Sequence, residues 1–461
     1  MKNPKSMSDL YNVIDVLGKG SFGEVVKCQK RDSGKQVAIK ILKYDCSSNY
    51  AIEHEIEMLN ALRKVDVEKF NILQFYEHFH DDSKHYMVFE LLQKNLFQYQ
   101  EEIGFAPLPV RHIRTISSQV LIALSKLSEL SIIHADLKPE NIVLVDQDRY
   151  PFRVKVIDFG CSYNSNEVRG MKEPCIQTLF YRAPEILLGL PFSEKVDMWS
   201  LGCIMAELHL GAPLYPGRTE YDQVRYICET QGLPKSHLLD TASKAPRFFN
   251  RKAGFKWALK TVDEYQMETR VKIAEWRKYI FKSLDHLQFI KYASFVNGNT
   301  EMLANYSEQK DMVEIIKCML TWDSHERINP EAAMNHQFIS RQHLRTNYTF
   351  TKHYQFVPES LSDSMKKETG QHFDAPPDIC DGTNDLAYYD REMELDRNPP
   401  FNSQNENTTS YGHHKASLLQ NISQFIGQFV NCIKCIFNWR KALPERQRDD
   451  EWSLIDEVDN V

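Results

Sequence analysis

The chain lacks an uninterrupted apolar run long enough to cross a membrane, which predicts that it has no transmembrane segment. No apolar run follows its first residues, so a signal peptide is not expected. Basic residues are not in excess: 56 Lys and Arg stand against 63 Asp and Glu, a net charge of −7. This balance disfavours general, direct nucleic-acid binding. The ten cysteines are scattered, several of them inside apolar stretches, which predicts reduced thiols rather than a disulfide framework.

What remains is the composition of a globular protein, 42% hydrophobic and 26% charged, and 461 residues are enough to bury a large core. Two short motifs carry most of the functional information in the sequence, one at 133–141 and one at 156–160. Asp136 can accept the proton of a substrate hydroxyl, and Lys138 can offset charge on a moving phosphoryl group. Asn141 and Asp158 offer hard oxygen ligands for Mg²⁺. Either motif alone is weak, but together, with strand-like runs at 142–145 and 154–157 between them, they predict phosphoryl transfer.

A glycine-rich stretch, 18–23, precedes these motifs and lies between two strand-like runs. Glycines let backbone N–H groups approach phosphates closely. The same spacing occurs in dinucleotide-binding domains, but there a helix follows the glycines, whereas here a strand is expected. The sequence therefore favours a phosphate-covering hairpin.

Lys40 lies in an apolar strand-like run, 36–42, where an ammonium group needs an anionic partner. ATP phosphates and a helix carboxylate would both serve. The following segment, 50–62, has helical apolar spacing. Glu55 on this helix is the first candidate for the ion pair, and Glu53 is the second.

Further along, the apolar run 86–92 predicts a strand that leads into a hinge. Backbone groups of Glu90 to Leu92 could bind adenine there, with Phe89 behind the pocket. Amphipathic spacing predicts a core helix at 111–130. The run 196–208 predicts a buried helix. We also expect a buried ion pair between Glu185 and Arg327.

Taken in order, these motifs resemble the eukaryotic protein kinases over residues 11–343. The resemblance implies an α+β, bilobal fold with a β-rich N-lobe at 11–92 and a mainly α-helical C-lobe at 93–343. More narrowly, the chain resembles the homeodomain-interacting protein kinases, with the dual-specificity tyrosine-regulated kinases as cousins. Segments that carry this resemblance are 134–141, 188–192, 212–217, 220–227, 230–234, 247–251 and 277–281.

The kinase resemblance implies roles for individual residues. Asp136, Lys138 and Lys40 are the expected catalytic residues, and Asn141 and Asp158 the expected Mg²⁺ ligands. The residues expected to bind ATP are Leu17, Gly18, Lys19, Gly20, Ser21, Phe22, Gly23, Val25, Ala38, Lys40, Glu55, Glu90, Leu92 and Val143.

The segment after Asp158 departs from the family pattern. Cys175 stands where the family usually has a self-phosphorylated tyrosine, and Leu179 where it has an arginine that holds the phosphate. We therefore expect a loop ordered by packing, with Arg182 bound to backbone carbonyls; a weakly active enzyme is the alternative. Thr178 is expected to bond Asp136 and Lys138. Tyr181 is expected to be packed rather than phosphorylated.

Outside the kinase region, the sequence predicts an N-terminal segment at 1–10, a flexible linker at 344–415, an amphipathic helix at 416–443 and an acidic tail at 444–461. The helix could dock on the chain's own kinase domain, pair with a partner helix or a second copy, or lie on a membrane surface. The sequence leaves these three interpretations open.

The expected activity is transfer of the ATP γ-phosphoryl group to serine or threonine of protein substrates, with proline after the target residue. Two alternatives remain: a dual-specificity kinase that phosphorylates its own Tyr163, and a scaffold with little turnover. The family resemblance makes transcription regulators candidate substrates and the nucleus the expected location, with the cytoplasm open.

Overall fold

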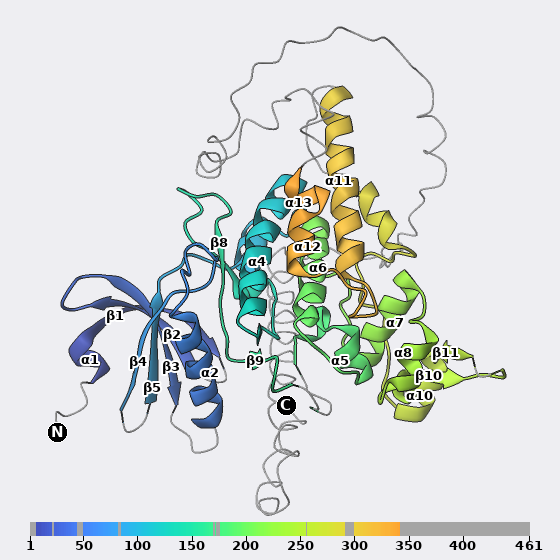
Figure 1. The fold of residues 1–461 in the computed structure, drawn as a ribbon, viewed down its shortest axis with the longest axis horizontal. Helices are drawn as coiled ribbons and strands as arrows, with labels where there is room; N and C mark the ends of the chain where they lie inside the picture. Colours follow the sequence, from blue (N-terminus) through green and yellow to red (C-terminus); the bar gives the residue numbers. More distant parts are fainter. Residues whose placement is uncertain are drawn as a thin grey trace, which may run out of the picture.

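Strands β1 to β5 form an antiparallel sheet near the N-terminus, in the order β1-β2-β3-β5-β4 (Figure 1). This computed structural model describes residues 6–20, 23–43, 49–81, 84–168, 171, 176–254, 256–290 and 299–341. The strands are β1 (Tyr11–Gly20), β2 (Gly23–Lys30), β3 (Gln36–Lys43), β4 (Phe75–His80) and β5 (Lys84–Glu90). The glycine-rich stretch thus connects two antiparallel strands, as predicted.

Two helices accompany this sheet, α1 (Met7–Leu10) and α2 (Asn49–Leu62). The buried face of α2 carries Ile52, Leu59 and Leu62, three of the apolar positions that predicted the helix. Glu55 is buried on the same helix, at 5% exposure. The apolar spacing therefore brings one carboxylate to the inner side of the N-lobe.

The rest of the described chain is mainly helical and forms the larger lobe (Figure 1). Its longer helices are α4 (Val110–Glu129), α6 (Lys195–Leu210), α7 (Glu220–Gln231) and α11 (Asn299–Met319). Shorter helices are α3 (Leu96–Glu102), α5 (Pro184–Leu188), α8 (Ser236–Thr241), α9 (Ala245–Phe248), α10 (Val262–Thr269), α12 (Pro330–Asn335) and α13 (Gln337–Ser340), with 3₁₀ turns η1 (Pro139–Asn141), η2 (Leu179–Tyr181) and η3 (Leu284–Phe289). A β-rich lobe joined to a helical lobe confirms the predicted bilobal α+β fold.

Helix α6 is the centre of the larger lobe, and every residue from Val196 to Leu210 on it is buried. Apolar residues surround the whole helix, which is typical of a helix enclosed on all sides. It contacts α4, α11 and the turn η2. Because it is fixed so completely, α6 can position residues of other segments.

Three short ladders complete the larger lobe. Strand β6 (Ile132–Ile133) pairs with β9 (Tyr163–Asn164), and β7 (Ile142–Leu144) pairs with β8 (Val154–Val156). A third ladder joins β10 (Phe249–Arg251) to β11 (Trp257–Leu259). The first two ladders bracket both predicted catalytic motifs.

Within the described residues, no helix has the length and apolar character needed to cross a membrane. The five cysteines in these ranges, Cys28, Cys161, Cys203, Cys228 and Cys318, are all free thiols, as expected. The predicted linker, amphipathic helix and acidic tail lie outside the described residues, and so does Cys175.

Candidate active site

The segment after β6 is held in place by a carboxylate on α6. Asp197 accepts hydrogen bonds from the backbone N–H groups of His134 (2.8 Å) and Ala135 (2.9 Å). Ala135 has a positive φ of 63°, a conformation that is uncommon for residues other than glycine. The two bonds to Asp197 stabilise this turn, which directs the following residue, Asp136, toward Lys138 and Thr178.

Asp136 forms a compact polar cluster with these two residues. One of its oxygens, Oδ2, accepts a hydrogen bond from Lys138 Nζ at 2.6 Å. The other, Oδ1, accepts from the backbone N–H (3.0 Å) and the hydroxyl (2.8 Å) of Thr178. Lys138 Nζ also lies 3.3 Å from Thr178 Oγ1. The predicted contacts of Thr178 are therefore confirmed.

Lys40 on β3 forms an ion pair with Glu55 on α2, as the sequence favoured. Its Nζ lies 2.6 Å from Glu55 Oε1 and 2.9 Å from Oε2, while Glu53 is exposed. Nζ also lies 3.3 Å from Asp158 Oδ1. Burial alone would lower the pKa of Lys40, but Asp158 and Glu55 raise it above its usual value. Lys40 is therefore fully charged at neutral pH.

Asp158 follows β8 and also has a positive φ, 64°. The Lys40 ammonium lowers the pKa of Asp158 to about 2, against the opposing effect of burial. Asp158 is thus an ionised carboxylate at neutral pH. Two residues later, Gly160 leaves little space: a Cβ there would lie 3.3 Å from Glu55 Oε2. The absence of a side chain at Gly160 lets Glu55 and Asp158 share one region with Lys40.

Asn141 lies close to Asp158 because β7 and β8 are paired. The N–H of Ile157 donates to the backbone oxygen of Asn141 at 3.0 Å, next to the start of the ladder. Asn141 Nδ2 donates to the backbone oxygen of Asp136 at 2.9 Å, which leaves the amide oxygen as a ligand atom. One carboxylate and one amide oxygen, completed by substrate phosphates, form a donor set that suits Mg²⁺.

The residues expected to bind ATP lie on both lobes. In the sheet, Ala38 on β3 is paired with Phe89 on the neighbouring strand β5, and Phe89 is 7% exposed. A position of Phe89 at the back of an adenine pocket stays a prediction. From the other lobe, Val143 on β7 bridges to Asn95 and is 7% exposed. The side chain of Glu90 pairs with Lys155 at 2.6 Å. The N–H of Glu90 donates to the backbone oxygen of Gln74 at 3.0 Å. Binding of an adenine ring by the backbone from Glu90 to Leu92 stays a prediction.

Strand β5 ends at Glu90, so Leu92 lies just beyond it rather than in the strand. In the glycine-rich hairpin, Lys19 is paired with Glu24 and Gly20 with Gly23, while Leu17 and Gly18 are exposed. Val25 on β2 faces Lys40 in register. Ser21 and Phe22 lie outside the described residues.

The segment before α5 is ordered by packing and by contacts of Arg182. Its Nε and Nη2 donate to the carbonyl oxygen of Gln177 at 3.2 and 2.9 Å, and its Nη1 lies 3.1 Å from Glu220. Leu179 packs against the core. The hydroxyl of Tyr181, a residue only 5% exposed, donates to Glu207 at 2.7 Å. Carbonyl binding by Arg182 and packing of Tyr181 are both confirmed.

Several contacts around the site could not be found by sequence reasoning. Lys155 on β8 is 1% exposed and pairs with Glu68 (2.5 Å) as well as Glu90. The buried carboxyl of Glu207 accepts the hydrogen bond of the Tyr181 hydroxyl in the turn η2. The sequence showed an apolar helix containing Glu207 and a strand containing Lys155, but no spacing rule relates either residue to its partner. The expected Glu185–Arg327 pair is present, at 2.7 Å.

Comparisons with known proteins agree with this geometry. The protein kinase domain model matches residues 11–339. Homeodomain-interacting protein kinase 4 of Homo sapiens is 56% identical over 376 residues, which cover 80% of this chain and 61% of the relative. The rat protein of the same name is 53% identical over 397 residues, covering 84% and 64%. Homeodomain-interacting protein kinase 1 of Mus musculus is 46% identical over 342 residues, covering 74% and 28%.

The chain thus spans about three fifths of the human and rat relatives. The similarity to the human relative extends over a longer stretch than the kinase domain itself. A domain match over most of the chain and identities of this size identify the family. The chain belongs to the protein kinases and, among them, to the homeodomain-interacting protein kinases.

Proposed function

We propose that this chain transfers the γ-phosphoryl group of ATP to serine or threonine hydroxyls of protein substrates. The observation that carries the proposal is the Asp136 cluster, in which a carboxylate, an ammonium and a hydroxyl lie within 2.6 to 3.3 Å of one another. Such a cluster can orient an incoming hydroxyl, accept its proton and offset charge at the transferred group. The alternative of a scaffold without turnover leaves this arrangement unexplained.

In this mechanism the residues of the site divide the tasks among them. Asp136 orients the substrate hydroxyl and accepts its proton, while Lys138 stabilises charge on the moving phosphoryl group. Lys40, held by Glu55 at 2.6 Å, binds the α- and β-phosphates. Asp158 and Asn141 would hold Mg²⁺, which offsets phosphate charge when it is bound. The rate enhancement then comes mainly from positioning and electrostatic stabilisation.

Arg182 supports a preference for proline after the target residue. The Gln177 carbonyl precedes Thr178, which contacts Asp136, and two Arg182 donors already occupy it. A substrate N–H beside this carbonyl would lose its acceptor, and an unpaired buried N–H is unfavourable. Proline has no N–H and escapes this penalty. A peptide with N-methylalanine after the serine should therefore be phosphorylated better than one with alanine.

For substrates and location, the proposal follows the relatives, whose names describe interaction with homeodomain proteins. We extend this to transcription regulators as substrates and to the nucleus as the place of action. Imaging of the full chain with a fluorescent tag tests the location. Exclusion from the nucleus would contradict it.

The activity itself is tested by phosphate transfer from labelled ATP to a generic Ser/Thr-Pro peptide. The full chain is compared with Asp136→Asn, which keeps the size of the side chain, and with Lys40→Arg, which keeps its charge. Loss of at least a hundredfold in both variants supports the proposal. No transfer by the unaltered, folded chain that binds ATP would replace it with the scaffold function. Phosphosite mapping of the same preparation, including Tyr163, tests the dual-specificity alternative.

A further inference from the structure

A cavity of about 580 Å³ opens in the larger lobe, away from the residues of the catalytic cluster. Its walls are the C-terminal end of α7, helix α8, the segment before η3 and the end of α11 with the turn after it. The apolar part of its lining consists of Leu233, Leu238, Leu284, Leu320 and Trp322. Leu233 is 47% exposed, and Trp322 Nε1 is buried with no hydrogen-bond partner among the described residues.

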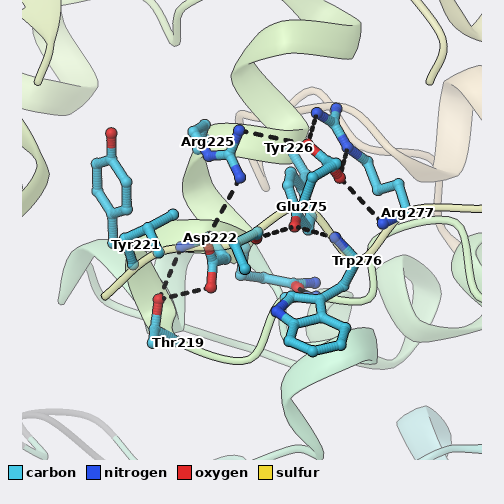
Figure 2. Close-up of polar contacts among 12 residues, drawn as sticks. Thr219, Tyr221, Asp222, Arg225, Tyr226, Glu275, Trp276 and Arg277 are labelled. Atoms are coloured by element: carbon cyan, nitrogen blue, oxygen red, sulfur yellow. Dashed lines mark hydrogen bonds and ion pairs between the residues drawn. The ribbon is translucent and has the colours of Figure 1, made fainter. Parts of the chain in front are cut away.

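Two walls of this cavity are held together by ion pairs of two largely buried arginines with carboxylates nearer the surface (Figure 2). Arg277, in the segment before η3, lies 2.6 Å from Glu229 on α7, and its side chain is 4% exposed. In a second ion pair the arginine comes from α7: Arg225 lies 3.5 Å from Glu275 of the other segment. Both guanidinium groups lie over the ring of Tyr226, at 4.1 and 4.6 Å.

Separating these walls would leave buried charges without partners, which is strongly unfavourable. In both walls the residues of these ion pairs are close in sequence to residues of the cavity lining. On α7, Glu229 is followed by Thr230 and Gln231, and in the other wall Arg277 is followed by Lys282. The cavity is therefore preformed, and a ligand would not have to open it. Preformed sites bind with a smaller entropic loss.

The rim of the cavity is positively charged. The segment 271–283 contains four basic residues and one acidic residue, Glu275. One of the basic residues, Lys282, lines the cavity, is exposed and makes no ion pair with any residue that the structure describes. Lys235 and Glu326, also in the lining, neutralise each other at 2.5 Å. Lys317 pairs with Asp285, outside the lining, at 2.8 Å, and Asp323 lies 3.3 Å from His237. The lining therefore carries three lysines and two carboxylates, a net charge of +1. This excess of positive charge, with the exposed Lys282 at the rim, favours an acidic ligand with apolar side chains.

The chain itself contains a segment of this chemistry. Residues 449–458 carry five acidic side chains and no basic one, around the apolar residues Trp452, Leu454 and Ile455. The other apolar stretch outside the described residues, 416–443, carries Lys434, Arg440 and Lys441 and no acidic residue. Its charge would repel the rim, so the acidic segment is the better match.

We propose that residues 449–458 of this chain dock in the cavity, with apolar side chains against Leu233 and Trp322 and acidic side chains at Lys282. Roughly 100 residues separate Arg341 from this segment, and an extended chain gains about 3.3 Å per residue, so length does not restrict docking. Binding within one chain also benefits from an effective concentration in the millimolar range for a short linker, which falls as the linker lengthens. The contact assigns a role to a part of the chain outside the kinase domain.

Hydrogen–deuterium exchange of the full chain tests the proposal. Amides of 449–458 should exchange at least fivefold faster in Lys282→Glu and in Leu233→Asp than in the unaltered chain. Both altered residues are exposed, so the fold is expected to tolerate the changes. Lys278→Glu is the matched control: it makes the same charge change on the same segment outside the cavity lining, and exchange should stay unchanged.

Two variants in the acidic segment approach the contact from the other side. Trp452→Ala should speed exchange of the cavity residues 230–238, and Asp450→Lys should restore protection when combined with Lys282→Glu. Exchange of 449–458 as fast as in a free peptide of the same sequence would overturn the proposal. Protection that disappears on tenfold dilution would assign the contact to a second copy and also overturn it. The readout does not use phosphate transfer, so it is independent of the proposed function.

Discussion

Glu207 is a buried carboxyl whose protonation state changes on folding. It is 3% exposed, and burial raises the pKa of its carboxyl to about 8, with a further contribution from the nearby Glu140. The hydrogen bond from Tyr181 works in the opposite direction but is outweighed. At neutral pH the folded protein therefore keeps a proton on Glu207 that the unfolded chain releases.

This proton makes the free energy of unfolding depend on pH. The stabilisation is complete below pH 4.5, the usual pKa, and is lost as pH rises toward 8. At about 1.4 kcal/mol per pKa unit, the loss is on the order of 5 kcal/mol at most. Glu207→Gln should remove this loss, so the variant gains stability relative to the unaltered chain between pH 5 and 8.5. Urea unfolding at several pH values measures it.

The exposed Glu57→Gln is the control for loss of a carboxylate. It should unfold with the same pH dependence as the unaltered chain. If Glu207→Gln also followed the unaltered curve, Glu207 would be ionised in the folded protein.

Thr178 shows how one hydroxyl can position a catalytic carboxylate. Thr178→Val removes the 2.8 Å hydrogen bond to Asp136 Oδ1 but keeps the backbone bond at 3.0 Å. Because Asp136 is then less well oriented, we expect kcat to fall about tenfold or more while KM for ATP changes little. Steady-state kinetics with both substrates gives the two constants.

Thr178→Ser serves as the conservative variant, since it retains the hydroxyl. It should keep most of the activity. Equal losses in the serine and valine variants would attribute the effect to packing of the threonine methyl group instead.

At the scale of elements, α5 is fixed by a residue far away in sequence. Arg327 is 1% exposed and donates to both oxygens of Glu185, at 2.7 and 2.8 Å. Arg327→Met leaves the Glu185 charge buried and unpaired, which should lower the free energy of unfolding by about 3 to 5 kcal/mol. Chemical unfolding measures this value.

The double variant Glu185→Gln with Arg327→Met separates the pair from the packing. It should recover part of the loss, because no unpaired charge remains. If the loss of unfolding free energy in the double variant equalled the sum of the losses in Arg327→Met and Glu185→Gln, the two residues would act independently.

The regular elements were predicted well where the apolar pattern was long. The helix expected at 111–130 is α4 (Val110–Glu129), and the one expected at 196–208 lies within α6. The strand expected at 86–92 ends at Glu90, because the next residues leave the sheet and Gln93 N–H bonds to Leu144. Such an end depends on a partner from another segment, which local periodicity does not contain.

The same limit applies to the site. Lys40–Glu55 was predictable because a buried lysine needs an anion and one helix offered it. The contacts of Lys155 with Glu68 and Glu90 were not, since the partners are 87 and 65 positions away along the chain. The elements between α7 and α11, such as the β10–β11 ladder, had no periodic pattern strong enough to predict.

At the scale of the whole molecule, Lys155 connects the two lobes. It lies on β8 in the larger lobe, and its partner Glu90 ends the last strand before the hinge. Lys155→Met should lower the free energy of unfolding by about 3 kcal/mol, because a buried cation is removed from two carboxylates. It should also weaken ATP binding, since the hinge backbone is less well held. Unfolding and nucleotide titration measure both effects.

Lys94→Met is a control near the same hinge. Lys94 forms an ion pair with Glu102, whose side chain is 55% exposed. Ion pairs at the surface contribute about 1 kcal/mol or less. If Lys94→Met and Lys155→Met behaved alike, the connection between the lobes would rest on other contacts.

The hydrogen bonds from His134 and Ala135 to Asp197 affect when the active site can form during synthesis. A ribosome releases the chain from its N-terminus, so β1 to β5 emerge well before Asp197. The partner of His134 and Ala135, Asp197, is synthesised 63 and 62 positions later. The partner of Glu185, Arg327, is synthesised 142 positions later. A nascent chain that stops before Asp197 therefore has its catalytic residues but not the carboxylate that supports them. One that stops before Arg327 leaves Glu185 without its ion-pair partner, and it needs protection from aggregation until translation passes that point.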